Sequence, residues 1–164
     1  MTRAALVIDA SAALHSALAA DPTPGLDDYE LFAPPLFLSE RTSSLSAAVF
    51  RGEIPEDAIQ EAFERLEAMP VTVVEGGRDD RWEALTLARS LGWAKTYDAE
   101  YVVLARRIGC PLLTTDQRLL RGAARSAEIL DPRTLGAASG ALFDSGQPSL
   151  AENVDQELEG FGDR

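Results

Sequence analysis

Four acidic residues of this 164-residue chain stand where carboxylates could act together: Asp9, Glu40, Asp98 and Asp116. Clustered carboxylates repel one another and raise each other's pKa values. A divalent cation such as Mg²⁺ or Mn²⁺, which prefers hard oxygen ligands, relieves that repulsion. Such a site can polarise a phosphodiester and activate a water molecule for attack. The acids therefore predict metal-assisted phosphodiester hydrolysis.

Each acid also has a purely structural interpretation. Asp116 could simply cap the helix that follows it, and Asp98 could be a first-turn acid that the helix dipole favours. Glu40 could be a solvated surface residue. Asp9 is the hardest to explain in this way, because a carboxylate directly after a buried strand is costly unless it is solvated, paired or bound to metal.

The rest of the composition excludes several other kinds of site. The chain has one histidine, His15, one cysteine, Cys110, and one lysine, Lys95. These counts exclude an intrachain disulfide, a zinc site built from cysteine and histidine, and any mechanism that needs two histidines. We expect His15 on a helix surface and Cys110 as a small core residue. Carboxylates are abundant instead, with 27 acidic against 15 basic residues and a net charge of −12.

Apolar runs and helical periodicities alternate along the chain. They predict strands at residues 4–8, 71–74, 112–115 and 128–130. They predict helices at residues 11–20, 36–50, 55–69, 82–91, 97–108 and 116–124. Residues 26–35 are acidic, end in two prolines and are expected to be irregular. Alternating strands and helices predict an α/β fold with a mostly parallel sheet, in which ligands bind beyond the carboxyl ends of the strands. The four acids can gather at that edge.

Composition divides the chain into a domain and a tail. Residues 1–136 carry the predicted elements, whereas residues 137–164 are rich in Gly, Ser, Gln, Asp and Glu. We expect this acidic C-terminal tail to be a linker followed by a weakly ordered or docking segment. The N-terminus lacks a signal-peptide pattern, and no run of 18 apolar residues occurs. We therefore expect a soluble cytoplasmic protein with no membrane contact.

Four short segments, at residues 7–12, 38–45, 97–101 and 112–116, contain the four acids. In composition and order they resemble the motifs of PIN-domain ribonucleases, and most closely those of the VapC toxins of bacterial type II toxin–antitoxin pairs. The resemblance covers about residues 4–136 and not the tail. It implies a three-layer α/β/α sandwich and a Mg²⁺-dependent endoribonuclease, with Mn²⁺ as a possible substitute. The expected products carry 5′-phosphate and 3′-hydroxyl ends.

The resemblance also assigns a role to each acid by its place in a motif. Asp9 and Asp98 are expected to ligate the metal directly. Glu40 and Asp116 are expected to complete the catalytic cluster, either directly or through water. All four positions hold an acid, so the sequence gives no reason to regard the enzyme as degenerate.

Two hydroxyls and three arginines complete the expected site. Ser11 and Thr114 match hydroxyl positions that support the metal ligands by hydrogen bonding. Independently of the resemblance, Arg118, Arg121 and Arg125 follow the last acid at roughly helical spacing. They are candidate contacts to RNA phosphates, and a solvated helix face is the alternative.

The resemblance implies partners as well. It predicts an RNA substrate, a VapB-type antitoxin that places a basic side chain among the carboxylates, and a homodimer. The alternatives are a PIN nuclease that processes RNA without an antitoxin, and a non-catalytic PIN-type RNA-binding or scaffold module. Of the two tryptophans, Trp82 fits a helical apolar face in the core or a dimer contact, while the role of Trp93 stays open.

Overall fold

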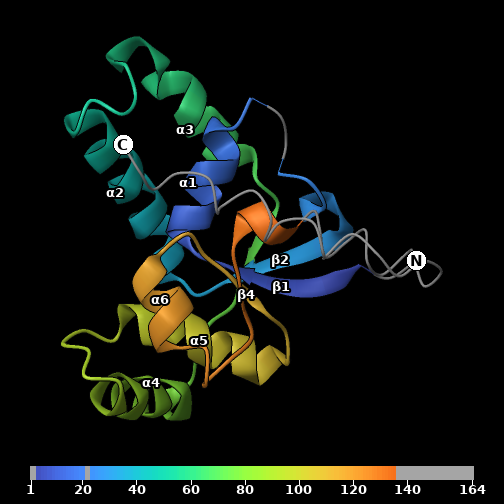
Figure 1. Cartoon of the computed structure of the whole chain (residues 1–164), viewed down its shortest axis with the longest axis vertical. Coiled ribbons are helices and arrows are strands. Elements are labelled where there is room, and N and C mark those ends of the chain that lie inside the picture. The colour runs from blue at the N-terminus through green and yellow to red at the C-terminus, as the bar shows by residue number, and fades with distance from the viewer. Residues whose placement is uncertain (1–2, 21–22, 136–164) are drawn as a thin grey trace, which may run out of the picture.

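The computed structural model describes residues 3–20 and 23–135, and its centre is a five-stranded sheet in which all neighbouring strands are parallel (Figure 1). The strand order is β3-β2-β1-β4-β5. The strands are β1 (Ala4–Ile8), β2 (Tyr29–Ala33), β3 (Val71–Val73), β4 (Leu112–Leu113) and β5 (Ile129–Leu130).

Helices cover both faces of this sheet. The helices are α1 (Ala10–Leu18), α2 (Leu36–Phe50), α3 (Ile59–Ala68), α4 (Arg78–Ser90), α5 (Tyr97–Ile108) and α6 (Gln117–Gly122), with 3₁₀ turns η1 (Leu26–Asp28) and η2 (Glu56–Ala58). Helices α1, α2 and α3 pack together on one side, and α4 and α5 pack together on the other (Figure 1). The predicted three-layer α/β/α sandwich with a parallel sheet is therefore confirmed.

The central strands form the middle of the core. Leu6, Val7 and Ile8 of β1 have no exposed surface, and neither have Leu112 and Leu113 of β4. A strand covered by helices on both faces must be apolar on both faces, which explains why these strands are continuous apolar runs. Burying such side chains supplies the main favourable term in folding.

The strand order creates one special position in the sheet. From β1 the chain moves outward through β2 to β3, and it then returns to the other side of β1 to form β4 and β5. The carboxyl ends of β1 and β4 are therefore neighbours from which the chain leaves in opposite directions. This is the topological switch point, where open α/β sheets leave a crevice for ligands.

Several sequence expectations need correction. Residues 29–33 are not irregular, because they form β2 between β1 and β3. The helix expected from residue 55 begins at Ile59, after the turn η2. The Trp82 side chain is 64% exposed, so it is not a core residue, and Cys110 is only half-buried.

Other expectations agree with the structure. Strand β1 and helices α2 and α5 have the predicted positions, and His15 is exposed on α1. Gly109 ends α5 with φ at 75°, a left-handed conformation that glycine adopts without strain. No described helix has the length and apolar character needed to cross a bilayer. The predicted tail at residues 137–164 lies outside the described residues.

Candidate active site

An open cavity of about 330 Å³ lies at the switch point of the sheet. All four sequence-predicted acids line it, and each comes from a different segment: the end of β1, α2, the first turn of α5, and the segment after β4. The cavity-lining residues are Asp9, Ala10, Ser11, Glu40, Ser43, Ser44, Ala47, Asp98, Tyr101 and Asp116. The fold thus brings carboxylates that are up to 107 positions apart in the chain onto one surface.

Asp9 is the most buried of these carboxylates, with 6% of its surface exposed. It is the N-cap of α1, and its Oδ1 accepts the backbone N–H of Ala12 and the hydroxyl of Ser11, both at 2.8 Å. Its Oδ2 accepts the hydroxyl of Thr114. Burial outweighs these hydrogen bonds and, with a contribution from the charge of Asp116, raises the pKa of Asp9 to about 6.

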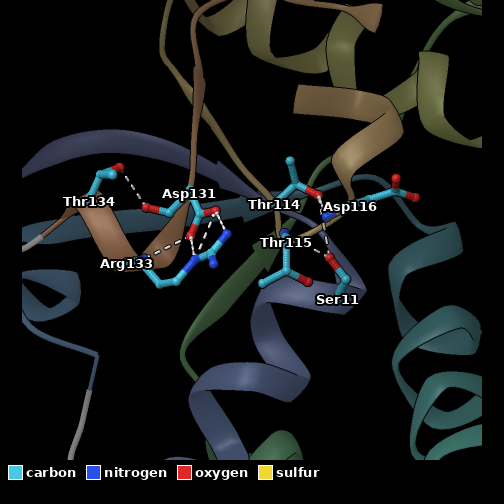
Figure 2. Close-up of polar contacts among 7 residues, drawn as sticks. All are labelled: Ser11, Thr114, Thr115, Asp116, Asp131, Arg133 and Thr134. Atoms are coloured by element: carbon cyan, nitrogen blue, oxygen red, sulfur yellow. Dashed lines mark hydrogen bonds and ion pairs between the residues drawn. The ribbon is translucent and has the colours of Figure 1, made fainter. Parts of the chain in front are cut away.

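Ser11 and Thr114 join the ends of β1 and β4 across the site, and Figure 2 shows their contacts with the β4 side. The Ser11 hydroxyl accepts the backbone N–H of Thr115 at 3.0 Å, and the Thr114 hydroxyl accepts that of Asp116 at 2.9 Å. Both hydroxyls therefore donate to Asp9 while accepting from the backbone that leads into α6. The structure places these two predicted support residues beside the carboxylates, and Thr114 is fully buried.

Glu40 is held by a residue to which the sequence assigned no role in the site. The buried Tyr101 of α5 donates its phenol O–H to Oε2 of Glu40 at 2.6 Å. Partial burial raises the pKa of Glu40, and the negative charges of Asp98 and Asp9 raise it further, against the lowering effect of the phenol. Burial and the Glu40 carboxylate raise the pKa of Tyr101 well above its usual value, so the phenol stays a donor.

Asp98 lies in the first turn of α5 and has the one cationic partner among the four acids in the part of the chain described. The guanidinium of Arg118 forms an ion pair with its Oδ2. Burial raises the pKa of Asp98 and the charge of Asp116 adds to this, while Arg118 lowers it. The same guanidinium lies over the ring of Trp93, 5.7 Å from the ring centroid.

Asp116 is the helix cap that the sequence allowed, and its side chain also reaches the cavity. It is the N-cap of α6, where its Oδ1 accepts the backbone N–H of Arg118 at 2.7 Å, and it also lines the cavity. Of the other two predicted arginines, Arg121 lies within α6 and Arg125 lies beyond its end, both exposed. Neither forms an ion pair with a described carboxylate of the site.

A second polar cluster in Figure 2 is separate from the cavity. After β5, Asp131 pairs with Arg133 and its carbonyl accepts the hydroxyl of Thr134 at 2.9 Å. The hydrogen bond from Arg133 lowers the pKa of Asp131. These contacts lie at the start of the helical segment at residues 132–135 and involve none of the four acids.

The donor chemistry of the cavity fits a hard divalent cation. Its polar lining is carboxylate and hydroxyl oxygen without nitrogen or sulfur ligands, which suits Mg²⁺ or Mn²⁺. The raised pKa values of Asp9, Glu40 and Asp98 show that their negative charges are costly where they stand. Each of the four carboxylates has its own partner within the protein. Within residues 3–20 and 23–135, no three acidic, histidine or cysteine side chains are arranged, as they stand, to hold a metal ion.

Known proteins resemble this chain in structure or in sequence. The protein PAE2754 from Pyrobaculum aerophilum has a similar structure, with a TM-score of 0.63 and 23% identity over 85% of this chain and 99% of that one. A PilT N-terminus domain protein, SSO1118 from Sulfolobus solfataricus, gives a TM-score of 0.46 and 17% identity over 89% of this chain and 99% of that one. Among curated proteins, no sequence relative matches. Residues 6–125 match the PIN domain, and because that match spans most of the chain, the protein belongs to the PIN domain family and has a nuclease-type fold.

Proposed function

We propose that this protein is a metal-dependent endoribonuclease and acts as the toxin of a toxin–antitoxin pair. The observation that supports the nuclease activity most strongly is the convergence of four carboxylates on one open cavity at the switch point of the sheet. No structural role explains why the four acids lie together, because capping a helix or ending a strand needs only one of them. A cation that they hold in common accounts for all four.

In this proposal Asp9 and Asp98 hold the metal directly, and Glu40 and Asp116 complete its shell directly or through water. A bound Mg²⁺ or Mn²⁺ would supply Lewis acidity and a more acidic water molecule. The chain's own groups do the orienting. Two hydroxyl donors and a backbone N–H fix both oxygens of Asp9, and a buried phenol fixes one oxygen of Glu40. Such outer hydrogen bonds are typical supports of metal ligands.

RNA would approach across the open side of the cavity, where Arg118 pairs with Asp98. Arg121 and Arg125 are exposed within and after α6, and all three arginines remain our candidates for phosphate contacts. The chain has a net charge of −12, so it offers little general attraction for a polyanion. Binding should therefore depend on these local arginines and on the cation.

The toxin role, the VapB-type antitoxin and the homodimer are proposals that rest on the resemblance of the four motifs to VapC toxins. The cytoplasmic location stays a proposal that rests on the sequence pattern alone. An acidic cavity of this kind is electrostatically suited to a basic side chain from a partner. Expression of the chain in bacteria should arrest growth, and co-expression of the product of an adjacent upstream gene should relieve the arrest. Growth unaffected by the active protein would contradict the toxin role and favour a PIN nuclease of RNA processing.

The decisive experiment is cleavage of RNA by the purified protein with Mg²⁺ or Mn²⁺, with and without EDTA. We expect cleavage that EDTA abolishes, and the variants Asp9→Asn and Asp98→Asn should lose it. Asp79→Asn is the matched control, because its side chain is fully exposed at the start of α4. Cleavage that survives chelation and both site substitutions would refute the mechanism. Equal cleavage of DNA would refute the choice of RNA, and RNA binding without cleavage would favour a non-catalytic module.

A further inference from the structure

Arg118 is held beside the cavity at both its backbone and its side chain. Its backbone N–H donates to Asp116, and its guanidinium pairs with Asp98. The guanidinium also lies over Trp93, 5.7 Å from the ring centroid. Trp93 packs against Gly122 of α6. The fit is close, because a Cβ at position 122 would be only 3.3 Å from the Trp93 ring. Three parts of the chain therefore fix this arginine: the start of α6, the first turn of α5 and the segment before α5 that contains Trp93.

We propose that Arg118 is a built-in counter-ion that holds Asp98 while the metal is absent, leaves it when the metal binds, and then becomes a contact for RNA phosphate. This inference rests on the proposed function and adds an order to it, in which the cation enters first and RNA follows. Arg118 is the one basic side chain paired with any of the four acids in the described part of the chain.

The physical argument is competition for one carboxylate. A guanidinium and a divalent cation repel each other at a few ångströms, so both cannot share Asp98 at full strength. The arginine can move, since its side chain is 60% exposed, whereas Asp98 is only 23% exposed and stays where α5 begins. An exposed ion pair is also weak enough for the metal to displace.

The displaced side chain can stay beside the cavity. Its guanidinium already lies over the face of Trp93, which attracts it, and after leaving Asp98 it would shift over that ring without leaving it. From there the guanidinium can meet a phosphate in a bidentate arrangement, which arginine favours. Metal binding would thus add one free positive charge to the surface that RNA must approach.

Trp93 makes the movement observable without an activity assay. In a Trp82→Phe background, Trp93 is the one remaining tryptophan of the chain, and Trp82 is exposed on α4, away from the cavity-lining residues. Titration with Mn²⁺ or Mg²⁺ is followed by Trp93 emission and, in parallel, by calorimetry. The variants are Arg118→Gln and, as the control of equal charge on the same helix, Arg121→Gln.

We expect the parent to show a saturable change in emission with its midpoint at the calorimetric Kd. Arg118→Gln should lose this change and bind the metal about two- to fivefold more tightly, the factor that an exposed ion pair is worth. Arg121→Gln should keep the emission change and have a metal affinity close to that of the parent. Under saturating metal, Arg118→Gln should also raise the KM for RNA.

Three results would overturn the inference. Calorimetric binding without an emission change in the parent would show that Arg118 does not move. An Arg118→Gln variant that binds metal no more tightly than Arg121→Gln would show that it does not compete. An emission change of equal size in Arg118→Gln would have another source. These three results leave the proposed function standing, because the metal still binds. A parent that binds no metal at all would refute the proposed function as well, so the two failures can be told apart.

Discussion

The burial of Asp9 leads to a prediction about stability that does not depend on finding the RNA substrate. In the metal-free protein the Asp9 carboxylate is almost fully buried, and its pKa is raised from 3.8 to about 6. Between these two pH values the folded protein binds more protons than the unfolded chain, so the free energy of unfolding falls as pH rises through that window. Above pH 6 the cost is fully present, and below pH 3.8 it is absent.

The magnitude follows from the two pKa values. At about 1.4 kcal/mol per pH unit, the difference between 3.8 and about 6 costs the folded state about 3 kcal/mol at pH 7.5 and roughly half of that at pH 5. Asp9→Asn removes the charge and keeps an oxygen that can accept from Ser11 and Ala12. It loses one charge-assisted hydrogen bond from Thr114, so we expect a net gain of about 1–3 kcal/mol at pH 7.5.

The assay is urea denaturation in EDTA at pH 7.5 and pH 5, with Asp79→Asn as the control for loss of one exposed negative charge. The control should stay within about 0.5 kcal/mol of the parent at both pH values. The advantage of Asp9→Asn should shrink by about half at pH 5. A variant that is less stable than the parent at pH 7.5, or an advantage that does not change with pH, would refute the reasoning.

Addition of the metal should reverse the order of stability. A ligand that binds only the folded state stabilises it by about 4.1 kcal/mol at one thousand times its Kd, which exceeds the advantage expected for Asp9→Asn. The parent should gain this stability from Mg²⁺, and Asp9→Asn should gain little. The residue would then be costly for folding and required for metal binding, which is the usual compromise at a functional site.

Three further substitutions test the supports of the site and its packing. Thr114→Val removes the buried hydroxyl that donates to Asp9, and we expect metal affinity to fall about 10- to 100-fold by calorimetry, with Thr114→Ser restoring it. Tyr101→Phe frees Glu40; metal affinity should fall while the far-ultraviolet circular dichroism is unchanged, and an unaltered affinity would exclude a positioning role. Arg41→Met removes a buried guanidinium that links α2 to the end of α3, and urea denaturation should show a loss of about 1–3 kcal/mol.

The sequence predicted the central strands well because their burial is complete. A strand covered on both faces is an unbroken apolar run, and β1 and β4 have that pattern. Strand β2 was missed for the opposite reason. It is amphipathic, with Leu31 and Ala33 buried and Glu30 exposed, and acidic residues before it and two prolines after it suggest a loop. Its pairing with β1 and β3, which no local pattern contains, determines its conformation.

The site residues also differ in how far the sequence predicts their positions. Strand topology places two of the acids, and only tertiary packing places the other two. Asp9 directly follows β1 and Asp116 lies three residues past the end of the adjacent parallel strand β4, so the topology places them close together. Glu40 and Asp98 lie on helices, and only the packing of α2 and α5 around the switch point brings them to the cavity. The bond from Tyr101 to Glu40 joins residues 61 positions apart, and its donor belongs to an apolar helix face that by itself predicts packing and nothing more.

The charge distribution around the cavity indicates the order in which the metal and RNA would bind. Elsewhere in the described chain several arginines pair with acids, such as Arg41 with Glu67 and Arg106 with Glu83. The cavity differs, since among its four carboxylates only Asp98 has a basic partner in the part described. Uncompensated negative charge is therefore concentrated where the phosphate of a substrate would have to lie. A polyanion would be repelled from that position until a cation neutralises it, and the same cation would release Arg118 toward the incoming phosphate. The acidity of the chain is thus compatible with RNA as a substrate provided that the metal binds first.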